Sequence, residues 1–257
     1  MTSGTTDWDA ATYHRLAAPQ EEWAREVLAR LPLRGDETVL DAGCGSGRTT
    51  VLLLERLPRG RVVAVDGSES MVAAARKTLA PFADRVEVMH ADLLDLELAE
   101  PVDLVFSNAV FHWIDDHDRL FQRLRATLRP AGALLAQCGG EGNVAEWQRA
   151  VGVAMELPEF SAFFEGWRGP WNFAGAEETE ARLRSAGFTE VRCWLENRAV
   201  EPDDPRQFVT VAGLAAHHER LPEDLREPFT DAVLDHLRGP LVLRYVRLNI
   251  EARVPPS

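Results

Sequence analysis

The stretch Val39-Leu40-Asp41-Ala42-Gly43-Cys44-Gly45-Ser46-Gly47 joins a short apolar run to a turn that holds three glycines. The residues that follow, from Thr49 to Leu57, repeat apolar side chains at helical spacing. Glycines at a strand-to-helix turn let the backbone approach a ligand, and the N-terminus of the next helix offers free N–H groups. The stretch therefore predicts the first βα unit of an α/β fold, with a nucleotide-like ligand at its turn.

Apolar strands and amphipathic helices alternate on both sides of this turn. We expect helices over residues 20–31, 49–57, 69–79 and 116–128, and strands over 38–40, 62–65, 86–89, 104–106 and 133–137. The segment Pro130–Gly132 is expected to form a turn before the last of these strands. Alternation of this kind predicts a parallel sheet that is covered by helices on both faces.

The pattern is less regular beyond Gly139. We expect helices over 144–157, 177–186, 205–218 and 223–237, and strands over 191–195 and 242–254. Aromatic residues are concentrated between Phe160 and Phe173, which predicts an insertion that either caps a site or buries its own side chains. His217 and His218 are interpreted as surface residues, because neighbours on a helix diverge by about 100° and do not share one metal site.

Charge and cysteine usage restrict the class of protein. The 257 residues include 41 acidic and 28 basic side chains, and the formal net charge of −13 opposes binding to a phosphate backbone. We expect no nucleic-acid partner, whereas a local basic cluster leaves an anionic small substrate open. Cys44, Cys138 and Cys193 show no C-x-x-C spacing, and no apolar run approaches about eighteen residues or resembles a signal peptide. We therefore expect a cytoplasmic protein without a disulfide framework, a metal site or a membrane span.

Polar residues follow the other predicted strands at the same edge of the sheet. Asp66 ends the second strand about 20 residues beyond the glycine turn, where a carboxylate accepts hydrogen bonds from ribose hydroxyls. Asp92 follows the third strand and Asn108 the fourth, and open parallel sheets bind ligands along that edge. The dinucleotide pattern G-x-G-x-x-G needs a third glycine where Arg48 stands, and no G-x-x-x-x-G-K-[ST] run occurs. The set favours an adenosine ligand and disfavours NAD and nucleoside triphosphates.

The turn over residues 41–47, Asp66, the segment Ala91–Leu93 and Asn108 resemble the successive motifs of class I S-adenosylmethionine-dependent methyltransferases, across residues 36–140. The resemblance implies a Rossmann-like, doubly wound, mostly parallel seven-stranded α/β sheet with helices on both faces and a helical insertion as a lid. It also implies S-adenosylmethionine as the cofactor, S-adenosylhomocysteine as its product, and no metal. The implied cofactor-binding residues are Asp41 at the amino-acid end, Gly43, Cys44 and Gly45 along the methionine part, Asp66 with Gly67 at the ribose, Asp92 with the Leu93 amide at the adenine, and Asn108.

A narrower resemblance, to trans-aconitate methyltransferases, reaches both ends of the sequence. It is carried by Trp8, Tyr13, the run Phe106–Trp113, the pair Asp116-His117, Gln137, Asn143 and the ending Tyr245–Arg253. It implies one domain over 1–257, with a lid segment and helix in 1–35, the cofactor-binding core in 36–140, an insertion with substrate-side helices in 141–240 and the last strand in 241–257. It also implies O-methylation of a small carboxylic acid, while C-, N- or O-methylation of a natural-product intermediate stays open.

Four residues are candidates for the acceptor side of such a site. An ionised carboxylate needs no base, whereas a phenol, an amine or an enolisable carbon needs proton removal, for which His112 is the best-placed imidazole. The alternative is a histidine that only shapes the pocket. Trp113 either walls the acceptor pocket or belongs to the core, and Tyr13 would supply area and a polar tip from the lid. Arg247 either binds an acceptor carboxylate or makes an ordinary salt bridge, and Arg244 faces the other side of the same strand.

Two further classes of protein remain open at this point. A nicotinamide-dependent oxidoreductase shares the fold and the ribose acid but lacks the third glycine, and titration with NADH tests it. A non-catalytic S-adenosylmethionine-binding protein would bind the cofactor without turning over any acceptor.

Overall fold

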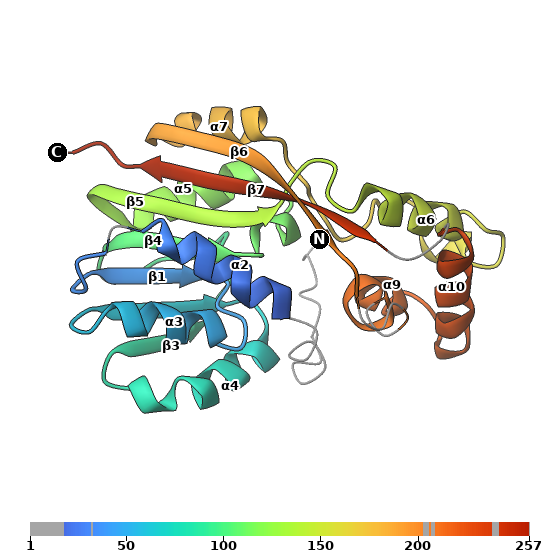
Figure 1. Ribbon diagram of the computed structural model, residues 1–257, viewed down its shortest axis with the longest axis horizontal. Coiled ribbons are helices and arrows are strands. Elements are labelled where there is room, and N and C mark those ends of the chain that lie inside the picture. Colours follow the sequence, from blue (N-terminus) through green and yellow to red (C-terminus); the bar gives the residue numbers. More distant parts are fainter. Residues whose placement is uncertain (1–17, 32, 203–205, 207–208, 238–241, 257) are drawn as a thin grey trace.

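The computed structural model describes residues 18–31, 33–202, 206, 209–237 and 242–256. A seven-stranded sheet crosses the molecule in the order β3-β2-β1-β4-β5-β7-β6 (Figure 1). Its strands are β1 (Thr38–Ala42), β2 (Arg61–Asp66), β3 (Val86–His90), β4 (Val102–Asn108), β5 (Leu128–Gly139), β6 (Thr189–Val200) and β7 (Leu243–Arg253). Strands β1 to β5 pair in parallel, and β7 runs antiparallel to both of its neighbours. The predicted mostly parallel sheet is confirmed.

Alternate residues of the strands pack into two cores on opposite faces of the sheet. Val39 joins the core under α2 (Ala18–Ala29), α3 (Arg48–Arg56) and α4 (Glu69–Thr78). Leu40 joins the core under α5 (His117–Thr127) and α7 (Ala176–Ser185). Strands that are apolar on both faces are typical of a buried parallel sheet. The arrangement brings the carboxyl ends of β1, β2, β4 and β5 to one edge, and β7 adds Arg247 there, opposite Gly139.

A third core lies beyond the ends of β6 and β7, where Figure 1 shows α6 (Ala145–Met155), α9 (Ala215–His218) and α10 (Glu223–Asp235) grouped together. Phe160 and Phe164, on either side of the short helix η3 (Ser161–Phe163), are buried in it with Phe229 of α10. The aromatic insertion therefore buries its own side chains, which was one of the two alternatives.

Two local predictions are wrong. The segment Pro130–Gly132 is not a turn before β5 but an irregularity inside it, because Val102 pairs with Leu128 and Leu104 already pairs with Ala133. The helix expected over 205–218 is a π-helical turn, η4 (Val209–Gly213), followed by α9; residues 203–205, 207 and 208 lie outside the described residues. Gly213 lies against the ring of Trp147, where a Cβ would come within 2.7 Å of a ring carbon.

The surface assignment of His217 is also wrong. His217 is 1% exposed, and the rings of Phe164, Trp167, Trp171 and Phe229 surround it. Burial lowers the pKa of this imidazole to about 3, with smaller contributions from the charges of its neighbours. Periodicity could not distinguish this position, because its partners come from distant segments of the insertion.

Candidate active site

The glycine turn between β1 and α3 is tied to the end of β2. The amides of Gly43 and Cys44 both donate to the carbonyl of Val65, at 2.8 and 2.9 Å. Gly43 has φ +83°, and a Cβ there would lie 2.2 Å from a methyl carbon of Val110, so the loop after β4 packs directly on the backbone. Gly45 has φ +54°, and nothing lies within 4 Å of its Cβ position. The turn is therefore closed toward β4 and open at Gly45.

Two carboxyl groups lie beside this turn, the half-buried Asp66 and the buried Asp41. Asp66 accepts hydrogen bonds from the amides of Gly45 (2.8 Å) and Ser68 (2.9 Å), one on each oxygen. Burial raises the pKa of Asp66, and the two amides oppose that rise. Asp41 accepts the hydroxyl proton of Thr50 at 2.6 Å, and burial raises its pKa to about 7. Each Asp66 oxygen keeps a lone pair for a ligand hydroxyl.

The loops after β2 and β3 lie next to each other, because Asp66 and His90 are paired in the sheet. The imidazole Nε2 of His90 lies 3.0 Å from the carbonyl of Gly67, so it donates a proton there. Asp92 is exposed, and its Oδ1 accepts the Leu94 amide at 2.9 Å. The side chain of Leu93 is buried in the sheet core. His90 was missed by the sequence analysis, although its place at the end of β3 matches that of Asp66 at the end of β2.

Asn108 ends β4 with an unused acceptor. Within the described part of the chain, its Oδ1 is buried and has no hydrogen-bond partner. The next residue, Ala109, has φ +62°, and its amide donates to the carbonyl of Gln137 at 2.7 Å. Positive φ at a residue with a Cβ is strained, and such positions are frequent at ligand sites. A ligand that carries N–H or O–H donors fits this edge, since Asp66 and Asn108 both offer acceptors.

His112 and Trp113 lie on the short helix η2 (Phe111–Trp113), which follows β4. His112 is 9% exposed, and its Nδ1 accepts the amide proton of Gly139, at 3.2 Å, from the end of β5. Burial, together with the smaller effects of the charges of Arg247 and His117, lowers the pKa of His112 to about 3. The imidazole is therefore neutral at physiological pH.

A short segment of the insertion, residues 171–173, holds this loop in place. The amide of Asn172 donates to the carbonyl of His112 at 2.8 Å, and its side-chain amide donates to the carbonyls of Ile114 (3.2 Å) and Asp115 (3.0 Å). The flanking rings continue the contact: Phe173 lies 5.7 Å from His112, and Trp171 lies 5.9 Å from Trp113. Trp113 thus lies where the insertion meets the sheet. No local pattern in the sequence marked Asn172.

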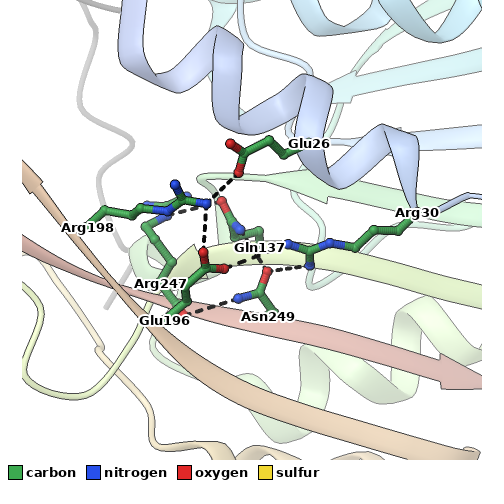
Figure 2. A network of polar contacts seen from close by, with 7 residues as sticks. All are labelled: Glu26, Arg30, Gln137, Glu196, Arg198, Arg247 and Asn249. Carbon is green, nitrogen blue, oxygen red and sulfur yellow. Dashed lines mark hydrogen bonds and ion pairs between the residues drawn. The ribbon is translucent and has the colours of Figure 1, made fainter.

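Arg247 is held in a buried polar network between α2 and the sheet (Figure 2). It is 4% exposed, its Nε donates to the side-chain Oε1 of Gln137 at 3.3 Å, and its guanidinium lies 4.9 Å from the centre of the Trp23 ring. The Nε2 of Gln137 (2.7 Å) and the Nη1 of Arg30 (2.6 Å) both donate to Oδ1 of Asn249. These contacts fix the direction of the guanidinium.

An outer layer of ion pairs covers this network. Arg198 of β6 lies 2.7 Å from Glu26 of α2 and 2.7 Å from Glu196 (Figure 2). The seven residues drawn contain three arginines and two glutamates, so the cluster is net positive in a chain of net charge −13. Arg244 is exposed and pairs with Glu146, which confirms that it does not share the surroundings of Arg247. Tyr13, the remaining candidate, lies outside the described residues.

Two absences hold for the described residues. No group of three or more histidine, cysteine, aspartate or glutamate side chains is arranged to hold a metal ion. Each helix in the described ranges is too short or too polar to span a lipid bilayer.

Comparison with known proteins gives three findings. Residues 39–132 match a family model described as a methyltransferase domain. The relatives of this chain include two proteins, from different bacteria, that are both named trans-aconitate 2-methyltransferase. The one from Azoarcus sp. is 46% identical over 130 residues, 51% of this chain and 50% of that protein, and the one from Methylobacterium nodulans is 32% identical over 98% of this chain and 92% of that protein. The solved phosphoethanolamine N-methyltransferase 2 of Haemonchus contortus has the same fold, with a TM-score of 0.62 at 19% identity over 96% of this chain and 57% of that chain.

Proposed function

Because this chain belongs to the trans-aconitate 2-methyltransferase family, we propose that it transfers a methyl group from S-adenosylmethionine to a carboxylate oxygen of a small organic acid such as trans-aconitate. The observation that carries the acceptor class is Arg247, a buried guanidinium held rigidly beside His112 in an otherwise acidic chain. Guanidinium groups bind carboxylates through paired hydrogen bonds. The three cysteines are free, which fits the reducing cytoplasm in which we propose that the enzyme works.

The edge of the sheet fits the cofactor. We assign the ribose hydroxyls to the free lone pairs of Asp66, beside Gly67, and the adenine to Asp92 and the Leu93 amide. The methionine part would pass along Gly43, Cys44 and the open side of Gly45, with its amino-acid end toward Asp41. The buried Oδ1 of Asn108 is an acceptor that a cofactor donor would satisfy.

The chemistry then depends mainly on placement. S-adenosylmethionine supplies a methyl group on a positively charged sulfur, which is a good leaving group. Alignment of two bound reactants contributes about 7 to 11 kcal/mol to lowering a barrier. Arg247 would hold the acceptor carboxylate in line at the ends of β4 and β5, and Trp113 and Trp171 would exclude water from the insertion side. Tyr13 is proposed to complete the pocket from the lid.

The deciding experiment combines binding with turnover. Isothermal titration should show binding of S-adenosylmethionine and none of NADH, and mass spectrometry should detect a monomethyl ester of trans-aconitate. A panel of carboxylic acids, phenols and amines identifies the acceptor class. Binding of NADH instead, or methylation of phenols or amines alone, would contradict the proposal. Cofactor binding without turnover of any acceptor would favour a non-catalytic protein.

Asp66→Ala tests the ribose assignment. Hydrogen bonds to a charged group contribute about 1.5 to 3 kcal/mol each, so the Kd for S-adenosylmethionine should rise roughly ten- to a hundredfold in calorimetry. Asp84→Ala removes an exposed carboxylate elsewhere and should leave the Kd unchanged. Equal affinities of the two variants would show that Asp66 does not hold the ribose.

A further inference from the structure

The backbone of β5 determines which nitrogen of His112 carries the proton. The amide of Gly139 donates to Nδ1 at 3.2 Å, so Nδ1 must present a lone pair. A neutral imidazole has one protonated nitrogen, and here that nitrogen is Nε2. Within the described part of the chain, no residue is hydrogen-bonded to Nε2. His112 therefore presents a single N–H donor and no second lone pair.

The ring is also fixed in position. Phe173 and Trp113 lie against it, with centroid distances of 5.7 and 5.2 Å. Asn172 donates hydrogen bonds to the carbonyls of His112, Ile114 and Asp115, which fix the backbone of the loop that carries the ring. A bulkier residue cannot replace Gly139, because a Cβ there would lie 2.5 Å from the Phe173 ring.

The charged groups around the ring disfavour a second proton. Arg247 faces it from β7 and His117 from α5, and Cys138 of β5 lies next to the Gly139 amide. Burial keeps the thiol of Cys138 protonated by raising its pKa to about 12. The surroundings therefore contain a fixed positive charge and no carboxylate that would stabilise an imidazolium among the groups that act on it.

We propose that His112 is a fixed Nε2–H donor that, with Arg247, holds an acceptor already ionised in solution, and that it is not a general base. This inference rests on the proposed function. An oxygen of the ionised carboxylate forms the new bond to the methyl carbon while the carbon–sulfur bond breaks and its electron pair stays on sulfur. No proton has to move, so the site needs donors rather than a base. His112 would then offer no base for a phenol or a protonated amine, which must lose a proton before it can accept the methyl group.

Three substitutions separate the possible roles of His112. In His112→Gln the side-chain amide reaches about as far as Nε2 and keeps a donor there, while the bond to Gly139 is lost. In His112→Asn the side-chain oxygen can still accept from Gly139, but the donor is lost. In His112→Leu both are lost. The Kd for S-adenosylmethionine, measured by calorimetry, should be the same in all three variants and shows that they fold.

The expected readout is the KM for the carboxylic acid. It should rise roughly ten- to a hundredfold in the Asn and Leu variants, with little change in kcat, and the Gln variant should recover most of that loss. If His112 only supported the Gly139 amide, the Asn variant would have a lower KM than the Gln variant, because only Asn keeps that hydrogen bond. A general base would make all three equally slow in kcat. Either result overturns the proposal.

A measurement on the unmodified protein tests the same point. Correlation spectra of protein labelled with 15N-histidine, assigned with the Gln variant, should show His112 as the Nε2–H tautomer across the neutral pH range. A protonated Nδ1, or titration near neutral pH, overturns the proposal whatever the acceptor is. Failure of the unmodified enzyme to methylate any carboxylic acid would instead contradict the proposed function.

Discussion

Arg247→Met is expected to lower kcat/KM for trans-aconitate by a factor on the order of a hundred or more. Removing one member of a buried, hydrogen-bonded charged pair typically costs about 2 to 5 kcal/mol. The methionine fills much of the volume of the arginine stem against Trp23, so the change acts mainly on the charge and its hydrogen bonds. Steady-state kinetics with the cofactor saturating measures the effect, which should fall mainly on KM.

The same strand supplies the control for this variant. Arg244→Met removes an equal charge from an exposed position of β7 and should leave kcat/KM close to that of the unmodified enzyme. Arg247→Lys should recover only part of the loss, because an ammonium cannot form the paired contacts of a guanidinium. If Arg247→Met and Arg244→Met behaved alike, the carboxylate would be bound elsewhere.

Asp41→Asn is expected to change how stability depends on pH. In the folded protein, burial raises the pKa of Asp41 from its usual 3.8 to about 7, so the protonated form is favoured. Below about pH 4 the folded and unfolded chains both hold the proton. As pH rises from there to 7, the unfolded chain loses its proton first, and folding becomes less favourable by up to about 4 kcal/mol in total. Asparagine cannot ionise and should not show this loss.

Urea unfolding without cofactor at a series of pH values measures this difference. Relative to the unmodified protein, Asp41→Asn should gain stability steadily between pH 4 and 7 and stay level above that. The part of the difference in unfolding free energy between the two proteins that is the same at every pH reports only how well the asparagine amide fits beside Thr50. Asp84→Asn removes a charge from the surface and should show no such gain. A difference between Asp41→Asn and the unmodified protein that does not vary with pH would mean that Asp41 is ionised in the folded chain.

The cofactor edge could be predicted because its signals are local. A glycine turn after an apolar strand and an acid at the end of the next strand are adjacent to the elements that position them, so the places of Asp41 in β1 and Asp66 at the end of β2 could be predicted, while their roles toward the cofactor stay predictions. The same holds for most helices of the first 140 residues, whose apolar faces cover a sheet that is buried on both sides.

The surroundings of Arg247 and His112 depend on contacts between residues that are distant in the sequence, and sequence patterns did not predict these contacts. Gln137 and Arg247 are 110 residues apart in the sequence, and Arg30 and Asn249 are 219 apart. The role of Asn172 depends on the carbonyls of a loop more than fifty residues earlier. His112 was identified as the best-placed imidazole, but only the amide of Gly139 shows which nitrogen holds the proton.

The position of β7 between β5 and β6 has a consequence for how the protein is made. Ribosomes deliver β6 before β7, yet the ladder of β6 is formed with β7. Until β7 has been synthesised, β6 therefore lacks the strand with which it pairs. An unpaired strand edge is prone to pairing with other chains. Arg247 arrives with the same late strand, after the whole cofactor half has emerged. Under the proposed assignments, the residues for the methyl donor are thus synthesised well before the residue that would recognise the acceptor.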